Sequence, residues 1–455
     1  MAISDNVQWE VRADGSDNNG GGFVAGASGT DYSQQAGAHA SGIDLTVDAI
    51  SDIDVQPDGY TPVAADIGNI IQITAGAGWV LGWYQIVGIV GTQWRLDRSP
   101  APAGSTGGVW ALGGALASPG KGAAALVLAG SKLWIRSGTY TITSSTANVS
   151  GGTMSLANAT KSIIGYGTTR GDGGRPTIVA DSLISSFALI TNGSVYSVNN
   201  LILDGNSRPS SRGIQTTGSN GFVTVRNCKG QNFTNGFISG LGIARDCYAT
   251  GCTSVAPFSI NHCVSCVADG NSVSGFSWTT QSSVFAYCLS VNNSGAGSDG
   301  FVGNNNILWV HCVAYNNGRH GFSISAGSQP VFSLVSCIAY QNAGTGFMAG
   351  SAYSDMKLLY NCAAGANGTN FSANFGSGTQ VNSVTLTADP FTNAAGKDFS
   401  LNNTAGGGAA ARSAGFGTYP EISTTGYPDV GAAQHADPPA GGGGGSLIAG
   451  GLVVT

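Results

Sequence analysis

Five aspartates are the only acidic residues between positions 204 and 380, so carbohydrate chemistry on this stretch would have to use them. Glycosidic cleavage needs two carboxylates about 5 to 9.5 Å apart. A lyase needs clustered acids for calcium and a basic residue that takes the proton. The five share no common spacing and no two are adjacent, so the sequence predicts no catalytic residue and leaves enzymatic activity as an alternative. They are Asp204, Asp246, Asp269, Asp299 and Asp355.

Basic side chains give a second kind of candidate site. Two arginines stand two positions before successive cysteines, and Asp246 beside the second suggests a surface ion pair. Two histidines and an arginine would form a basic patch in one repeat, although histidines on a β surface are usually solvated. We treat these residues as candidate contacts to a glycan: Arg226, Arg245, His311, Arg319 and His320.

Cysteine usage could indicate a metal. His262, Cys263 and Cys266 have the residue types of a zinc site. However, Cys266 belongs to a regular series of cysteines, and no second ligand pair lies at usable spacing. The nine cysteines are an odd number, which favours reduced, buried core residues over a disulfide framework. The sequence therefore predicts no metal and no cofactor.

The cysteines belong to a repeat that organises the chain from 227 to 371. Seven cysteines follow one another at spacings of 19, 19, 22, 24, 25 and 25 residues. An asparagine lies five residues after each of the last five, and a phenylalanine closes each unit. The cysteines are Cys228, Cys247, Cys266, Cys288, Cys312, Cys337 and Cys362; the asparagines are Asn271, Asn293, Asn317, Asn342 and Asn367; the phenylalanines are Phe237, Phe258, Phe276, Phe301, Phe322, Phe347 and Phe371.

This repeat predicts an all-β fold, a right-handed parallel β-helix with one coil per unit. The unit is too short for a helix pair, and its apolar runs of four to six residues are separated by Asn, Gly and Ser. Such a unit buries its apolar face only by stacking on copies of itself. Asparagine suits the corners because it tolerates left-handed backbone and can bond along a ladder of its own kind.

Strand alternation assigns the two faces of each coil. If the cysteines point inward, the residues two before them (such as Val264 and Val310) and two after them (such as Ala268 and Ala314) do so too. The opposite face then carries an apolar stripe, for which we expect packing between three copies of the chain. The alternative is an inverted phase in which the stripe is core. The stripe consists of Val267, Leu289, Val291, Val313, Tyr315, Ile338 and Tyr340.

The flanking regions predict four further parts. Residues 1–41 read as an extended N-terminal arm, and residues 42–117 as a small antiparallel β domain whose four tryptophans are core or an aromatic platform for sugars. Residues 118–403 form the β-helix, beginning with a helix over 118–130 that covers its open end. Residues 404–438 form a C-terminal cap folded back along the coils. Residues 439–455 are a glycine linker with an apolar tail.

Composition limits the partners. Charged residues are only 9% of the chain and the net charge is −6, so nothing favours nucleic acid. The start of the chain has no export signal, and no run of 18 apolar residues predicts a membrane span.

The coil pattern over about residues 120–435 resembles the right-handed parallel β-helix proteins of the pectate-lyase-like superfamily. The segments WEVRADGSDNNGGGF (9–23), SGTDYSQQ (28–35), 65–89 and 96–108 resemble the leading modules of β-helix proteins encoded by tailed bacteriophages, and GYGTTRGDGGRPTI resembles their first coils. The resemblance implies a structural virion protein: a homotrimeric spike, fibre or capsid decoration, assembled in the host cytoplasm and contacting other virion proteins. Contact with host polysaccharide, or its degradation by a tailspike, is the alternative. The acidic clusters of the enzymatic members are not found in this sequence.

Overall fold

The computed structural model describes residues 3–126, 130–142, 154–156, 161–181, 187–192, 195–216, 221–278, 282–304, 306–324, 332–350, 357–375, 380–412, 414–415 and 429–433, and the statements below concern these residues. The chain divides into two compact units, residues 1–208 with 214–223 and residues 209–213 with 224–455. Each unit is described by itself.

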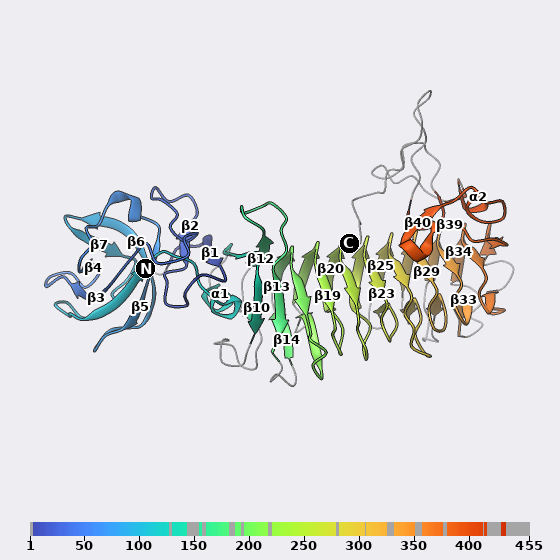
Figure 1. The fold of residues 1–455 in the computed structure, drawn as a ribbon, viewed down its shortest axis with the longest axis horizontal. Helices are drawn as coiled ribbons and strands as arrows, with labels where there is room; N and C mark the ends of the chain where they lie inside the picture. The colour runs from blue at the N-terminus through green and yellow to red at the C-terminus, as the bar shows by residue number, and fades with distance from the viewer. Residues whose placement is uncertain are drawn as a thin grey trace, which may run out of the picture. The chain divides into compact units, whose positions relative to one another are not determined.

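The first unit contains a closed antiparallel barrel with the strand order β3-β4-β7-β6-β5-β8. The barrel strands in Figure 1 are blue to cyan. Trp79, Trp94 and Trp110 are buried in its core as predicted, whereas Trp83 lies outside that core, is only partly buried and packs edge-on against Trp9. The elements are β3 (Ala40–Val47), β4 (Asp54–Gln56), the 3-10 helix η1 (Ala64–Asp66), β5 (Ile70–Ala75), β6 (Gly82–Val90), β7 (Gln93–Leu96) and β8 (Gly108–Leu112).

The N-terminal arm is ordered by pairing with the first coil of the β-helix. Strand β1 (Val7–Val11) pairs in parallel with β9 (Lys132–Arg136) and antiparallel with β2 (Gly22–Val24). Helix α1 (Pro119–Ala125) begins after Ser118, whose hydroxyl accepts a hydrogen bond from the Lys121 N–H at 3.3 Å. The predicted helix is therefore present, but it is shorter than predicted and ends at Ala125, with Leu126 as its C-cap. The other coil strands of this unit are β10 (Thr139–Ile142), β11 (Met154–Leu156), β12 (Lys161–Tyr166), β13 (Thr177–Ala180), β14 (Phe187–Asn192), β15 (Val195–Asn199) and β16 (Ile202–Asp204).

The second unit is a stack of parallel coils, which confirms the parallel β-helix. One face is the sheet β19 (Lys229–Gln231), β21 (Tyr248–Thr250), β23 (Val267–Asp269), β26 (Leu289–Val291), β29 (Val313–Tyr315), β32 (Ile338–Tyr340), β35 (Ala363–Gly365) and β38 (Val384–Leu386). The other strands are β20 (Ile238–Arg245), β22 (Phe258–Val264), β24 (Phe276–Trp278), β25 (Ser283–Ala286), β27 (Phe301–Gly303), β28 (Ile307–Val310), β30 (Phe322–Ile324), β31 (Phe332–Val335), β33 (Thr345–Ala349), β34 (Lys357–Tyr360), β36 (Thr369–Phe371) and β37 (Gln380–Val381). Strands β17 (Ser211–Thr216) and β18 (Phe222–Arg226) lie where the two units divide.

The phenylalanine column is a stack of rings inside the coils. From Phe258 through Phe276, Phe301, Phe322 and Phe347, successive ring centroids lie 4.7 to 5.0 Å apart with nearly parallel planes. This spacing equals the distance between neighbouring strands of a sheet, so the rings stack because the coils do. All five rings are buried.

The asparagine column forms a ladder of amide hydrogen bonds. The Nδ2 of Asn271 donates to the Oδ1 of Asn293 at 2.8 Å, and the pattern continues through Asn317 and Asn342 to Asn367 at 2.8 to 2.9 Å. Asn317 also donates to the carbonyl of Ser290 at 3.0 Å. The first four are buried, so these bonds replace water for each amide.

Replacing Asn317 with alanine is expected to destabilise the chain by about 2 kcal/mol, because the buried amides of Asn293 and Asn342 both lose a partner. Thermal and denaturant unfolding measure the change. The matched control is Asn316→Gly, one residue away on an exposed side chain. It should cost about 1 kcal/mol or less, since it removes one exposed hydrogen bond to Asn292 and glycine adopts the φ of 52° at this position without strain. Equal losses for the two variants would contradict the ladder's role.

The cysteine column is buried, and its thiols line up from coil to coil. The Sγ of Cys312 donates to the carbonyl of Phe285 at 3.3 Å, and the Sγ of Cys337 donates to the carbonyl of Trp309 at 3.5 Å, so equivalent thiols reach equivalent carbonyls of the preceding coil. Burial raises the pKa of these thiols. All nine cysteines of the chain are free and buried, which confirms that they are reduced core residues.

Left-handed backbone lies beside the columns rather than within them. The residue before each cysteine has positive φ, including Asp246, Ser265 and Tyr287, and so does the residue before each ladder asparagine, including Asn292 and Asn316. A left-handed residue turns the chain and breaks the alternation of side chains. The sequence predicts that one corner asparagine both adopts left-handed backbone and forms the amide ladder. In the structure, the residue before it has the left-handed backbone, and the asparagine itself forms the ladder.

This turn corrects the predicted inward face on one side of the cysteines. The residues two after them, such as Ala268 and Ala314, are fully buried as predicted. Val264 and Val310, two before them, are only partly buried, and the positions three before them, such as Phe285 and Trp309, are fully buried instead. The left-handed residue directly before each column cysteine interrupts the alternation of side chains, so a strict alternation predicts the wrong inward positions on that side.

The apolar stripe faces out of the coils, but the chain covers it itself. We call residues 389–415 with 429–433 the C-terminal segment. It contains β39 (Phe391–Asn393), η2 (Ala394–Gly396), β40 (Asp398–Leu401) and α2 (Gly408–Ala411). It forms one apolar cluster with Val291, Val313, Ile338 and Tyr340, and Leu289 and Tyr315 pack against that cluster.

This corrects the predicted subunit interface: Val291, Val313, Ile338 and Tyr340 are at most 6% exposed within one chain. Val267, the first residue of the stripe, is also buried. The predicted end of the β-helix at residue 403 is also wrong. Residues 391–401 form the antiparallel pair β39–β40 in place of a last coil. The predicted linker and tail, 439–455, lie outside the described residues.

Candidate functional site

Arg226 and Arg245, two of the predicted glycan contacts, lie together on successive coils beside Asp246. The N–H of Asn227 donates to the carbonyl of Arg245, and the Arg245 Nε lies 3.6 Å from a carboxylate oxygen of Asp246. The side chains of Arg245 and Asp246 are each nearly half exposed. Desolvation raises the pKa of Asp246 despite the lowering effect of both arginines. The group is an accessible surface ion pair of small energetic weight.

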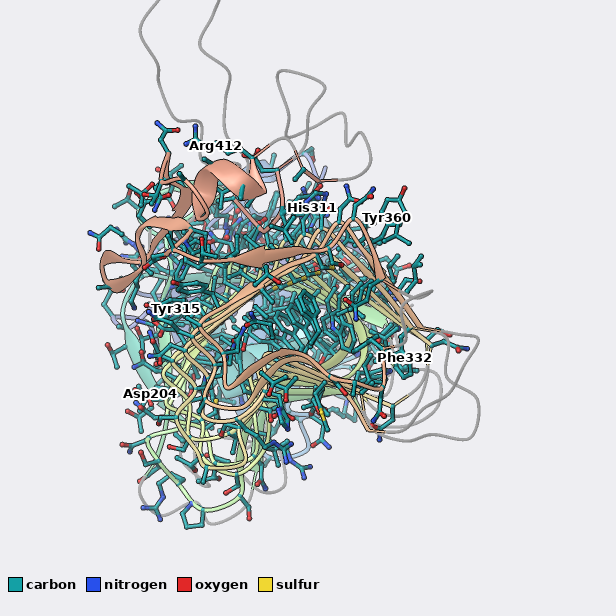
Figure 2. All side chains as sticks on the ribbon, turned by 90° about the vertical axis from the view of Figure 1, so that its right-hand side faces the viewer. Asp204, His311, Tyr315, Phe332, Tyr360 and Arg412 are labelled. Atoms are coloured by element: carbon teal, nitrogen blue, oxygen red, sulfur yellow. The ribbon has the colours of Figure 1, made fainter. Side chains whose placement is uncertain are left out.

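His311, a third predicted contact, is buried beneath the C-terminal segment. Its Nδ1 donates to the carbonyl of Asp429 at 2.9 Å, and its ring stacks on Tyr287 with centroids 5.1 Å apart. Figure 2 shows His311 and Arg412 on the side of the coils where the C-terminal segment runs. His311 therefore helps to hold the C-terminal segment on the coils. Because it is buried, it does not form a glycan-contact surface with Arg226 and Arg245.

Arg319 and His320 lie around a fully buried carboxylate. Asp299 is 0% exposed and accepts hydrogen bonds from the Nε and Nη2 of Arg319 at 2.7 and 2.6 Å and from the backbone N–H of His320 at 3.0 Å. The Nδ1 of His320 accepts the N–H of Thr345 at 2.9 Å. Since that nitrogen is an acceptor, the imidazole is neutral, and desolvation lowers the pKa of His320.

Acidification is expected to weaken folding through His320. Its folded pKa lies below the ordinary value of 6.5, so its contribution is fully present above that value. It is lost as the pH falls towards the folded pKa, by at most about 1.4 kcal/mol per pH unit. Denaturant unfolding at pH 7.5 and 5.5 should show this loss, and His320→Asn should reduce it. An unchanged pH dependence in His320→Asn would contradict the assignment.

A cluster that sequence analysis missed joins the C-terminal segment to the coils. The Nζ of Lys397 lies 2.5 Å from the carboxylate of Asp269, which is 6% exposed, and Tyr248 donates to the same carboxylate at 2.8 Å. Lys397 and Lys229 lie over the Tyr248 ring at 5.6 and 5.7 Å. The bond to Asp269 raises the pKa of Lys397. Tyr248 and Asp269 lie on the neighbouring strands β21 and β23, two register positions apart, and nothing in the repeat indicates their contact or Lys397.

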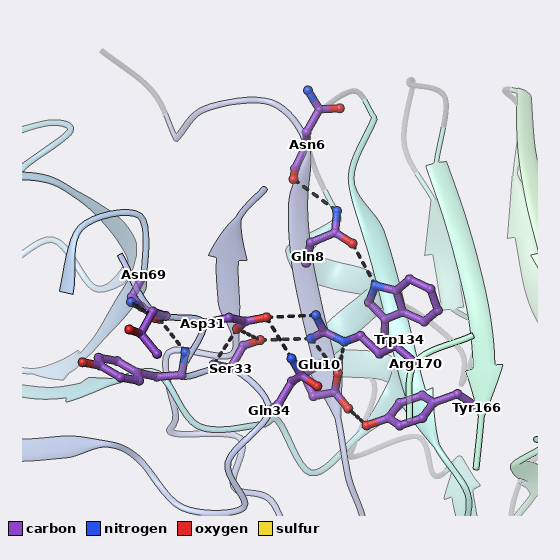
Figure 3. Close-up of polar contacts among 12 residues, drawn as sticks. Asn6, Gln8, Glu10, Asp31, Ser33, Gln34, Asn69, Trp134, Tyr166 and Arg170 are labelled. Atoms are coloured by element: carbon purple, nitrogen blue, oxygen red, sulfur yellow. Dashed lines mark hydrogen bonds and ion pairs between the residues drawn. The ribbon is translucent and has the colours of Figure 1, made fainter. Parts of the chain in front are cut away.

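A second missed cluster holds the N-terminal arm (Figure 3). The carboxylate of Glu10 is 0% exposed and lies 2.7 Å from the guanidinium of Arg170. The same guanidinium reaches Asp31 at 3.0 Å and the hydroxyl of Ser33 at 3.0 Å, and Tyr166 donates to Glu10. Desolvation raises the pKa of Glu10, although Arg170 and Tyr166 lower it. Two carboxylates joined by one partly buried arginine act as a clamp between the arm and the coil.

The glycine-rich segment around Arg170 is built as a turn on Asp172. Its carboxylate accepts the backbone N–H groups of Gly167, Thr168, Thr169 and Gly174. These bonds lower the pKa of Asp172 strongly. The turn presents Arg170 to Glu10.

The remaining candidates from the sequence are the three residues with the types of a zinc site. His262 is half-buried, whereas Cys263 and Cys266 are fully buried and interact with each other. Within the described ranges, no three residues among His, Cys, Asp and Glu are grouped as metal ligands. No helix in the described part of the chain is long and apolar enough to cross a membrane.

Comparison with known proteins gives structural neighbours alone. No family model matches the chain, and no curated protein matches it. Among solved structures it is similar to the pectate lyase Pel9A, at 14% identity and a TM-score of 0.42, covering 70% of this chain and 91% of that one. It is also similar to the catalytic domain of a GH87 alpha-1,3-glucanase in complex with nigerose, at 14% identity and a TM-score of 0.34, covering 76% and 78%.

The chain is an all-β protein in which a small antiparallel barrel accompanies a parallel β-helix.

Proposed function

We propose that this chain is a structural protein of a bacteriophage particle, a β-helix decoration, fibre or spike on the capsid or tail. The observation that carries the proposal is how the coils use their charged groups. Asp299 and Asp269 are buried, and each carboxylate is engaged by a cation, Arg319 or Lys397. These charged side chains hold neighbouring coils and the C-terminal segment together, which is the use expected in a protein that acts as a rigid support.

The internal ladders support the same function. Phenylalanine rings, asparagine amides and thiols each continue from coil to coil. Because every coil pairs with its neighbours, the stack resists local opening. The leading segments at 9–35 and 65–108 resemble virion β-helix proteins, which supports a place on a particle. A homotrimer remains part of the proposal, but it would need a surface other than the covered stripe.

Two assays on the purified chain test this function. The chain should sediment with particles of the virus that encodes it, and incubation with host surface polysaccharide should release no new reducing ends or unsaturated sugars. Release of oligosaccharides by the wild type, lost in Asp269→Asn or Asp299→Asn, would contradict the structural role and favour a polysaccharide-degrading tailspike.

Polysaccharide binding is a second candidate, favoured by the outer face of β19 and β21. Lys229 lies over the ring of Tyr248, with Lys397 nearby, and cations beside an aromatic ring suit an acidic glycan. In affinity electrophoresis through acidic host polysaccharide, the wild type should be retarded and Lys229→Gln less so. Asp52→Asn, an exposed change in the barrel, is the control.

A further inference from the structure

Three loops gather at one end of the N-terminal barrel. The strands alternate in direction in the order β3-β4-β7-β6-β5-β8, so the loops 48–53, 76–81 and 97–107 must lie at the same end. Hydrogen bonds join them: Gly104 N–H donates to the Asp48 carbonyl at 3.1 Å, and Val80 N–H donates to the Pro100 carbonyl at 2.8 Å. We call this set of loops the barrel tip.

The barrel tip exposes large apolar side chains. Ile50 is 95% exposed, Val80 62% and Leu81 56%. Exposed apolar residues that gather in one place usually mark an interaction surface, whereas single ones need no explanation. The tip brings three of them together on loops that are tied to each other.

The tip is also held in a fixed conformation. The carboxylate of Asp48 accepts the N–H of Ile50 at 2.8 Å and the side chain of Gln93 at 3.0 Å. The hydroxyl of Tyr84 donates to the Val80 carbonyl at 2.6 Å. A preorganised surface loses less conformational entropy when it binds a partner.

Charge indicates the kind of partner. Residues 42–117 contain seven aspartates and two arginines, and no lysine or glutamate. Asp44, Asp48 and Asp52 lie on or beside the tip, whereas Arg98 is engaged by Asp97 and by the Trp83 carbonyl. Two tips from copies of this chain would bring aspartates together, and an anionic membrane would repel them. A basic protein surface is complementary.

We propose that the barrel tip docks this chain onto another protein of the particle, through an apolar pocket with a basic rim. The inference rests on the proposed function and adds to it the attachment surface and the chemistry of the partner. Ile50, Val80 and Leu81 would enter the pocket, and Asp48 and Asp52 would face its basic rim.

The test adds purified full-length chain to particles assembled without it and measures the bound amount by sedimentation. Replacing Ile50, Val80 and Leu81 together by serine should lower binding at least about tenfold, because the central apolar contacts are lost. Val87→Ser with Val90→Ser is the matched control, since both valines are over a third exposed on β6, outside the tip. Circular dichroism melting checks that each variant is folded.

A charge variant provides an independent test. Asp52→Lys should weaken binding more at low salt than at high salt, as expected for an acidic surface on a basic one. If the triple serine variant bound to particles as well as the wild type does, the inference would be overturned and the proposed function would stand. Failure of the wild type to bind particles would overturn both.

Discussion

Deleting residues 389–455 is expected to make the chain self-associate into larger particles than the full-length protein forms. The deletion removes Phe391, Phe399 and Leu401, which are buried against Val313 and Ile338. Burial of three such side chains contributes on the order of 5 kcal/mol, and the deletion leaves a wet apolar stripe across several coils. Size-exclusion chromatography with light scattering measures the association, and thermal unfolding measures the loss of stability.

The matched control is a chain that ends at Ala433, which keeps the whole C-terminal segment. This chain should behave as the full-length protein does in both measurements. If the chain lacking 389–455 kept the size and melting temperature of the full-length protein, the C-terminal segment would not be the cover that the structure indicates.

Replacing Arg170 with methionine is expected to destabilise the first unit by about 3 to 5 kcal/mol. The change leaves Glu10, which is 0% exposed, and Asp31 without their shared cation. A buried charge that loses its partner is far more costly than an exposed one. Denaturant unfolding gives the stability, and hydrogen exchange at β1 should show the arm opening first.

Arg12→Met is the control for Arg170→Met, because Arg12 pairs at 2.9 Å with Asp14, which is 60% exposed. The Arg12 side chain is 15% exposed, as that of Arg170 is, but the Asp14 carboxylate stays in water, so losing this pair should cost only about 0 to 1 kcal/mol. Comparable effects of the two substitutions would argue against the clamp.

The repeat made the fold predictable, because stacked coils force equivalent residues into register. The columns of Cys312, Asn317 and Phe322 could be aligned in the sequence, and each is a continuous ladder in the structure. The barrel was predictable from strand-like runs separated by turn residues, and so was the burial of three of its four tryptophans, all except Trp83.

The sites were less predictable because their partners are far apart in the sequence. Arg170 is 160 residues from Glu10, and Lys397 reaches Asp269 from a turn with a φ of 66°. Neither contact follows from a periodic pattern. The predicted stripe was correctly assigned to the outer face, but a pattern cannot distinguish a second copy of the chain from a later segment of the same chain.

Asp299 shows the same limitation at a single residue. In the sequence it is an isolated acid eleven positions beyond a column cysteine, and Arg319 and His320 are an isolated basic pair. The turn of one coil brings them together as a bidentate ion pair. Contacts between neighbouring coils depend on loop lengths that differ from one repeat to the next, so the spacing does not predict them.

Comparison of particles with and without this chain by cryo-electron microscopy tests the central claim most directly. The account predicts difference density at repeated positions on the particle, into which stacked coils about 4.8 Å apart can be fitted. Particles that are indistinguishable with and without the chain, with the protein recovered only in the soluble fraction, would contradict it.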